Sequence, residues 1–314
     1  MDDRLRSADG AYKALHEILV RCGKAGEKAC EFAKGGDPVK KFATLAERLR
    51  KKPAIIDENG LKVTVTYADL IGATLRTLYE QDGWSQLGGF FESLYAATAP
   101  AGEVPAAEAA AAKRAIAQRV HKLRAQHRRP SAKSFSYNNS TDAFSSVICT
   151  DGRHPKRAES WPAATAKSDR RAPYFGRAWA WSSVQCAGNA WTVRDRGAYT
   201  GPFNRRTSAP VLFVGNYYDP ATNYDQAVSS SKLLPNSGLL SSDSWGHTAY
   251  GSSKCVTDAM DQYLLNVTMP KKGTVCVGDE QPFPDKGITA KTPGSAKRSP
   301  VYVPRIPSVL LGTR

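Results

Sequence analysis

The sequence lacks the features that define several large classes of protein. No apolar run approaches the roughly 18 residues that a transmembrane helix needs. No C-x-x-C pair and no cysteine–histidine cluster with zinc spacing occurs, so we expect no metal and no cofactor. The first ten residues, MDDRLRSADG, lack the apolar core of a signal peptide. Hydrophobic residues make up 41% of the 314, which excludes a wholly disordered or collagen-like chain.

The cysteines are even in number and widely spaced, which suits three disulfides and an oxidising compartment. Chain order favours the pairs Cys22–Cys30, Cys149–Cys186 and Cys255–Cys276. Sequence alone leaves other pairings open, and six buried, reduced cysteines are the alternative. A secreted protein is therefore expected, yet the chain carries no export signal and as given would stay in the cytoplasm. This conflict predicts that a segment is missing from its front.

The net charge of +15 comes mostly from two segments. Between Lys113 and Lys133 there are eight basic residues and no acids, and six more follow Asp285 without an acid. A basic helix can bind nucleic acid through phosphates. No recognition motif and no interleaved aromatic residues accompany it, which favours a solvated helix face and a soluble tail. Nucleic-acid and membrane partners are therefore not expected.

Residues 1–150 are predicted to be mainly helical. Apolar spacing predicts helices over 8–34, 38–51 and 84–95, a helix that opens at Thr66–Tyr67, and a basic helix that ends near residue 129. Asp37 and Thr66 are predicted N-caps. Residues 62–66 alternate like a short strand, and 144–149 read as an apolar turn or helix end.

Residues 151–283 differ in pattern. Residues 209–215 form a continuous apolar run, typical of a strand buried on both faces of a parallel sheet. A helix over 220–234, a second buried strand from Ser237 and a helix over 252–266 complete an α/β pattern. Residues 284–314, rich in Pro, Lys, Ser and Gly, are expected to form a loose basic tail.

An acid and a histidine follow these two strands. Asp219 comes after the first strand and His247 after the second, in the order of the acid and base of a Ser–Asp–His triad. The alternatives without a catalytic role are that Asp219, before Pro220, is only a helix N-cap, and that His247 is an ordinary loop residue. The other histidines have no comparable setting and are taken as surface or core residues: His16, His121, His127 and His154.

Several motifs carry a resemblance to a known family. They are APVLFVGNYYDPAT (209–222), SWGHTAYGSSKC (244–255) and the closing GTVC (273–276). Upstream, VTYADLIGATLRTLY (65–79) and ICTDG (148–152) fit a helical cap. The chain resembles tripeptidyl-aminopeptidase-like α/β hydrolases, which are secreted serine exopeptidases related to prolyl aminopeptidases.

The resemblance implies a fold and two site residues. The fold would be the C-terminal part of an α/β hydrolase, its last two parallel strands and their helices, preceded by a helical cap or lid over 1–150. Asp219 would be the triad acid and His247 the triad base. Asn223 departs from the family, which often has proline there, and this changes the helix start but not the carboxylate.

The nucleophile that the family uses is absent. No serine lies in a G-x-S-x-G elbow and no HGG-type oxyanion loop occurs. In the family both would lie upstream of Met1. We therefore expect the cap and C-terminal part of a serine aminopeptidase-like hydrolase, inactive alone. Its partners would be a peptide substrate in an intact relative and a separate N-terminal half. The alternatives are a non-catalytic complementing fragment and a basic nucleic-acid-binding module.

Asp151, in ICTDG, is a candidate for binding the amino end of a peptide substrate. The alternative is a turn-forming aspartate before Gly152.

Overall fold

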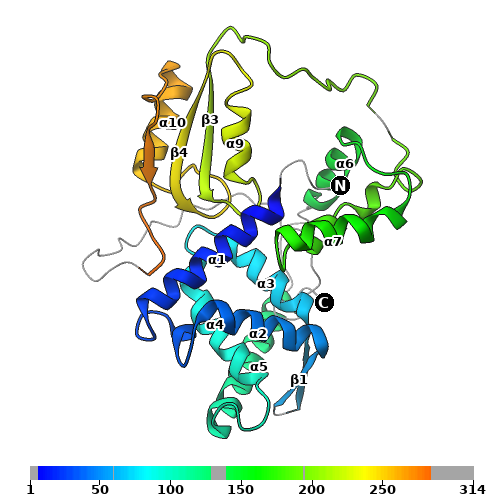
Figure 1. Cartoon of the computed structure of the whole chain (residues 1–314), viewed down its shortest axis with the longest axis vertical. Helices are drawn as coiled ribbons and strands as arrows, with labels where there is room; N and C mark the ends of the chain where they lie inside the picture. Colours follow the sequence, from blue (N-terminus) through cyan, green and yellow to red (C-terminus); the bar gives the residue numbers. More distant parts are fainter. Residues whose placement is uncertain (1–5, 59, 129–138, 194, 284–314) are drawn as a thin grey trace.

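The structure is a computed structural model that describes residues 6–58, 60–128, 139–193 and 195–283. Helices and one β-hairpin make up the part before residue 187, and a small parallel sheet with its helices makes up the part after 210 (Figure 1). The basic residues Arg129 and Lys133 and the predicted tail 284–314 lie outside the described residues.

Helix α1 (Ser7–Ala25) buries an apolar face and ends at Gly26, whose positive φ of 76° favours glycine. The prediction of one helix over 8–34 is therefore wrong. The chain turns at Gly26, and a short 3-10 helix η1 (Glu31–Ala33) follows. The Cys22–Cys30 disulfide ties the turn to α1.

Helices α2 (Pro38–Lys51) and α3 (Tyr67–Tyr79) begin where their sequences predict. Asp37 accepts a hydrogen bond from the Val39 backbone N–H, with Pro38 in the first helical position. Thr66 and Asp69 form a reciprocal capping box at the start of α3. Local side-chain chemistry thus fixes both helix starts.

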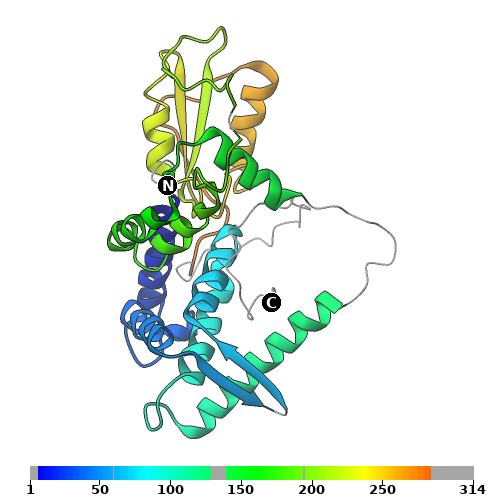
Figure 2. The ribbon, with the colours of Figure 1, turned by 90° about the vertical axis from the view of Figure 1, so that its right-hand side faces the viewer.

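A hairpin precedes α3. Strand β2 (Leu61–Val65) pairs antiparallel with β1 (Ala54–Glu58), a strand that the sequence pattern did not reveal. Helices α4 (Trp84–Ala97) and α5 (Ala106–Arg128) follow, and α5 packs against both α4 and the hairpin (Figure 2).

The chain then forms short helices. These are α6 (Ser140–Asp151), η2 (Ala158–Ser160), α7 (Trp161–Arg171), α8 (Gly176–Trp181) and η3 (Val184–Cys186). The apolar stretch 144–149 lies inside α6 and is not a turn. Ala172, Phe175 and Trp179, around and in α8, are buried in the same core as α1 to α4.

The C-terminal sheet is parallel throughout, in the order β3–β4–β5. Its strands are β3 (Val211–Tyr218), β4 (Ser237–Trp245) and β5 (Val275–Val277). Helix α9 (Tyr224–Ser230) joins β3 to β4, and α10 (Lys254–Asn266) joins β4 to β5, on opposite faces of the sheet (Figure 2). The expected two strands are therefore three, because GTVC contributes β5. Both helices are shorter than predicted.

Strand β3 is only half-buried over Val211–Val214, although its apolar run predicts burial on both faces. The reason is its place in the sheet. Among the described strands, β4 pairs with one edge of β3 and no strand pairs with the other. Its outer edge and apolar side chains therefore lack the neighbour that a central parallel strand has.

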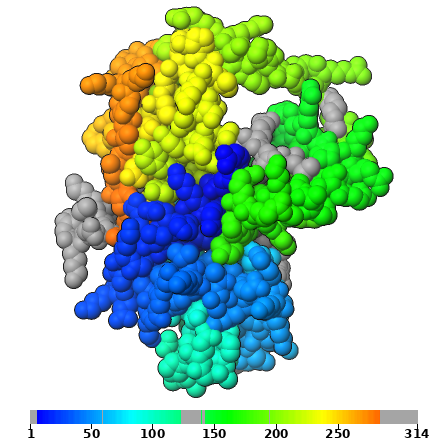
Figure 3. All heavy atoms as spheres, viewed as in Figure 1, coloured from blue at the N-terminus to red at the C-terminus, as the bar shows by residue number. Residues whose placement is uncertain are grey.

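Helix α1 joins the two parts of the molecule. It forms a band between the sheet and the helices of the N-terminal part (Figure 3). The main core extends across this band, because it includes Ala221 and Trp245 of the sheet part. The sheet's own core is small, with the buried residues Leu240, Ala249, Val256 and Cys276. None of the helices in the described part of the chain is both long and apolar enough to span a bilayer.

Candidate active site

Asp219 and His247 meet at the carboxyl ends of β3 and β4. Asp219 directly follows β3, and His247 lies two residues after β4. Because the two strands are parallel neighbours, their ends lie side by side. The His247 Nδ1 lies 3.1 Å from Asp219 Oδ1 and 3.0 Å from Oδ2. Residues 28 positions apart are thus joined, as strand order predicts.

The Asp219 carboxylate is buried and accepts hydrogen bonds from several donors. Oδ1 accepts from the backbone N–H groups of Ala221 (2.7 Å) and Thr222 (2.8 Å). Oδ2 accepts from the Thr222 hydroxyl (2.7 Å) and the Thr248 N–H (3.3 Å). All four groups donate, and both carboxylate oxygens accept, so the side chain is held in one orientation.

The interpretation of Asp219 as a helix N-cap is wrong. Helix α9 begins at Tyr224, and its N-cap is Asn223, whose side chain accepts from the Asp225 N–H. Asp219 instead closes a turn before the helix. The departure of this sequence at Asn223 therefore has a structural use, since asparagine caps a helix that proline could not cap.

The contact with Asp219 fixes the tautomer of the neutral imidazole. An ionised carboxylate can only accept, so His247 Nδ1 carries the proton and Nε2 carries the lone pair. No described residue forms a hydrogen bond with Nε2. The imidazole thus turns Nε2 away from the Asp219 carboxylate, which Nδ1 contacts.

Helix α3 contacts the histidine loop. The His247 N–H donates to the Tyr79 carbonyl at 3.0 Å, and the two rings make an edge contact with centroids 5.3 Å apart. Next to it, Gly246 approaches the backbone of Gln81 so closely that a β-carbon would lie 2.9 Å from its Cα. Tyr79 ends the motif VTYADLIGATLRTLY, but nothing in the sequence signals this contact.

Aromatic residues fix the ends of the two strands. Tyr218 stacks on Trp245 with ring centroids 3.9 Å apart. The Arg21 guanidinium of α1 lies 5.6 Å and 5.1 Å from the two ring centroids, within the range of cation–π attraction. Burial raises the pKa of the Tyr218 phenol, so it stays neutral at physiological pH. Tyr218 directly precedes Asp219 in the chain, and Trp245 lies two residues before His247. The stack is therefore next to both residues of the pair.

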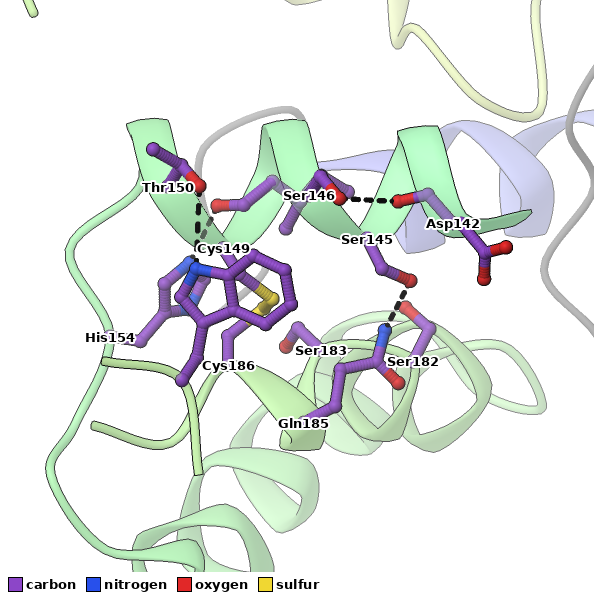
Figure 4. The surroundings of a disulfide bond; sticks show 12 residues. Asp142, Ser145, Ser146, Cys149, Thr150, His154, Ser182, Ser183, Gln185 and Cys186 are labelled. Atoms are coloured by element: carbon purple, nitrogen blue, oxygen red, sulfur yellow. Dashed lines mark hydrogen bonds between the residues drawn. A yellow bond between two sulfur atoms is a disulfide. The ribbon is translucent and has the colours of Figure 1, made fainter. Parts of the chain in front are cut away.

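Asp151 is not brought to this pair. It is the exposed last residue of α6, and its side chain forms no hydrogen bond or ion pair with the described residues. Near it, the Cys149–Cys186 disulfide joins α6 to η3 (Figure 4). His154 contacts the carbonyl of Ile148 there. The role of Asp151 in substrate binding stays a prediction.

A pocket of about 400 Å³ lies elsewhere, between α2 and the turn after α7. Its lining includes Glu47, Arg50 and Asp169, but neither Asp219 nor His247. Arg50 donates to the Tyr67 hydroxyl, and Asp169 pairs with Arg177. Because neither residue of the acid–histidine pair lines it, this pocket is separate from that pair.

The basic helix α5 buries its apolar residues Ala112, Ile116 and Val120 and exposes Arg114 and Lys122. This is the pattern of an amphipathic helix with a solvated face.

The molecule has the fold of the C-terminal part of an α/β hydrolase, with a mainly helical part before it. Residues 172–276 match a family model described as TAP-like protein. The chain is also similar to Carboxylesterase B of Mycobacterium tuberculosis (strain ATCC 25618 / H37Rv), with 25% identity over 286 residues. That alignment covers 88% of this chain and 49% of the relative, so the chain spans about half the length of this curated relative. These matches support an α/β hydrolase of the TAP-like type, and the family model covers residues 172–276 of the chain.

Proposed function

We propose that the chain carries the acid and the base of a serine-hydrolase site whose nucleophile comes from residues outside this sequence. The observation that supports this most directly is the contact of His247 Nδ1 with the buried Asp219 carboxylate. The sequence itself holds no G-x-S-x-G elbow. The pair therefore has the chemistry for acyl transfer but lacks the group that attacks.

In the proposed reaction, His247 Nε2 takes the proton of a serine hydroxyl as the serine oxygen attacks the substrate carbonyl. The Asp219 carboxylate stabilises the imidazolium that forms. His247 then gives the proton to the leaving amine, and an acyl-enzyme results. Water repeats the sequence, with His247 as its base, and releases the acid product.

The proposed substrates are peptides with a free amino end, from which short peptides or single residues are released. The match to the TAP-like model and the resemblance to tripeptidyl-aminopeptidases support this class. The relative named Carboxylesterase B makes esters the competing class. Secretion is part of the proposal, because three disulfides fit a protein that folds outside a reducing cytoplasm.

The open edge of β3 favours a complementing role for this chain. A parallel strand from a separate segment with the nucleophile would cover that edge and the half-buried residues Val211–Val214. The same docking would bring a serine to the acid–histidine pair. The docked segment would both cover the edge of β3 and supply the serine, so complementation and catalysis form one proposal. Its first prediction is that the chain alone is inactive.

That prediction can be checked by treating the purified chain with a fluorophosphonate probe. We expect no serine to be labelled, because no elbow serine faces His247. Stoichiometric labelling of any serine would contradict the proposal.

The second test co-expresses the chain with a segment that carries G-x-S-x-G. We expect hydrolysis of a peptide p-nitroanilide with a free amino end, and little hydrolysis of its N-acetylated form or of a p-nitrophenyl ester. His247→Ala should lower kcat by about 10⁶-fold. The exposed His121→Ala serves as the matched control and should leave kcat unchanged. Preference for the ester would instead point to an esterase.

A further inference from the structure

Asn216 connects β3 to the histidine loop. It is 2% exposed and lies three residues before Asp219. Its Nδ2 donates to the carbonyl of Gly246 at 3.2 Å and to the carbonyl of Thr248 at 2.9 Å. These carbonyls belong to the residues on either side of His247. One amide group therefore holds both flanks of the histidine.

The backbone of this loop needs such support. Gly246 has a φ of 82° and Thr248 a φ of 76°, so both neighbours of His247 take the left-handed conformation. For a β-branched threonine this conformation is strongly disfavoured. Contacts from the surroundings must therefore maintain it. The two Asn216 bonds are suited to do so, because they fix the carbonyls that this conformation orients.

The orientation of the Asn216 amide follows from its partners. Both carbonyls can only accept, so the nitrogen must face them and the oxygen must face Ser244. Ser244 Oγ lies 2.7 Å from Asn216 Oδ1 and therefore donates to it. Ser244 Oγ then accepts from the Ser242 hydroxyl, also at 2.7 Å. All three side chains are buried, so the chain Ser242–Ser244–Asn216 sets the amide in one orientation.

We propose that Asn216 is a positioning residue that holds the His247 imidazole against Asp219. This inference rests on the proposed function, in which Asp219 and His247 are the catalytic pair. Asn216 touches neither side chain of the pair in the hydrogen bonds described. It acts through the loop backbone, and Ser244 acts through Asn216.

The test uses the full 314-residue chain with ¹⁵N-labelled histidine. The readout is the His247 Nδ1–H resonance, assigned by its loss in His247→Ala, and its exchange rate with solvent. We expect Asn216→Ala to abolish this resonance or to speed its exchange by about tenfold or more, because the loop is released. A role limited to stability would leave the resonance unchanged in the folded fraction.

Asn236→Ala is the matched control. Asn236 Nδ2 also bridges two carbonyls, those of Thr207 (2.8 Å) and Ala209 (3.0 Å), but at the amino end of β4. In Asn236→Ala, we expect the exchange rate of the His247 Nδ1–H to stay within about twofold of the rate in the unchanged chain. Equal effects of the two variants would overturn the proposal.

If Asn216→Ala does not fold, Ser244→Ala decides. It removes only the hydroxyl that orients the amide, and we expect faster exchange of the His247 Nδ1–H. Ser183→Ala, at a buried hydroxyl in the helical part, is its control and should have no such effect. If Asn216→Ala folds and its exchange rate is unchanged, the proposal is overturned. If Asn216→Ala does not fold, an unchanged exchange rate in Ser244→Ala overturns it.

The same experiment separates this inference from the proposed function. If the unchanged chain shows no Nδ1–H resonance that depends on Asp219, as tested with Asp219→Asn, the acid–histidine pair itself fails. If the resonance is present and depends on Asp219 but not on Asn216, only the positioning inference fails.

Discussion

Gly10 lies where α1 passes the loop that carries the acid. A β-carbon on Gly10 would lie 2.4 Å from the backbone oxygen of Asp219 and 3.4 Å from Cα of Asn223. Both neighbours belong to a turn fixed by hydrogen bonds, so neither moves easily. The absence of a side chain at this one position lets the helix approach the acid loop.

We predict that Gly10→Ala destabilises the protein. In an open helical site the change would stabilise by up to about 1 kcal/mol. Here the clash should reverse the sign and lower the free energy of unfolding by about 1–2 kcal/mol. Denaturant unfolding measures it. Gly36→Ala, whose β-carbon would meet Lys41 Cδ at an ordinary 3.8 Å, should change stability by less than about 0.5 kcal/mol. A stabilised Gly10→Ala would show that α1 does not pack against this loop.

At the scale of residues, the sequence predicts the acid–histidine pair but not the residues that contact the histidine loop. Asp219 and His247 are found because each follows a strand, and strand ends meet by topology. Tyr79 and Asn216 are not found, because their contacts depend on how α3 and the loop after β4 pack. No local pattern encodes a backbone contact between residues 168 positions apart, such as that of His247 with Tyr79.

Three disulfides act at the scale of elements. Cys22–Cys30 fixes the turn after α1, Cys149–Cys186 joins α6 to η3, and Cys255–Cys276 joins α10 to β5. They link residues 8, 37 and 21 positions apart, respectively. Each ties a helix to a short or irregular neighbour.

We predict that removing each disulfide by paired Cys→Ser changes lowers stability in order of loop length. The chain-entropy model gives about 4 kcal/mol for Cys149–Cys186, about 3 for Cys255–Cys276 and about 2.5 for Cys22–Cys30. Denaturant unfolding of the unchanged chain and of each paired Cys→Ser variant measures these differences in the free energy of unfolding. A reversed order would mean that local packing outweighs the entropy of the unfolded chain.

Elements with strong local signals are predicted well, and the others are not. Helices α2 and α3 carry their own caps, so their starts follow from sequence. Strands β1 and β5 are short, and only pairing with β2 and β4 makes them strands. The half-burial of β3 also escapes a local pattern, because it depends on which strand lies beside it.

The whole molecule has a large helical core and a small sheet core, joined along α1. We predict that amides of β3 exchange with deuterium much faster than those of α2 and α3, because one edge of β3 is unpaired. Mass spectrometry of peptic peptides measures this. Slow exchange of β3 would show that its edge is covered. The mass of the chain in solution would then tell whether a second copy covers it.

The position of Arg6 has a practical consequence. Its carbonyl accepts from the Asn223 side chain, and α1 starts directly beside the turn that holds Asp219. Arg6 itself therefore lies next to the turn that holds the acid of the pair. A photo-crosslinking residue in place of Arg6 would capture whichever segment docks at this edge of the sheet.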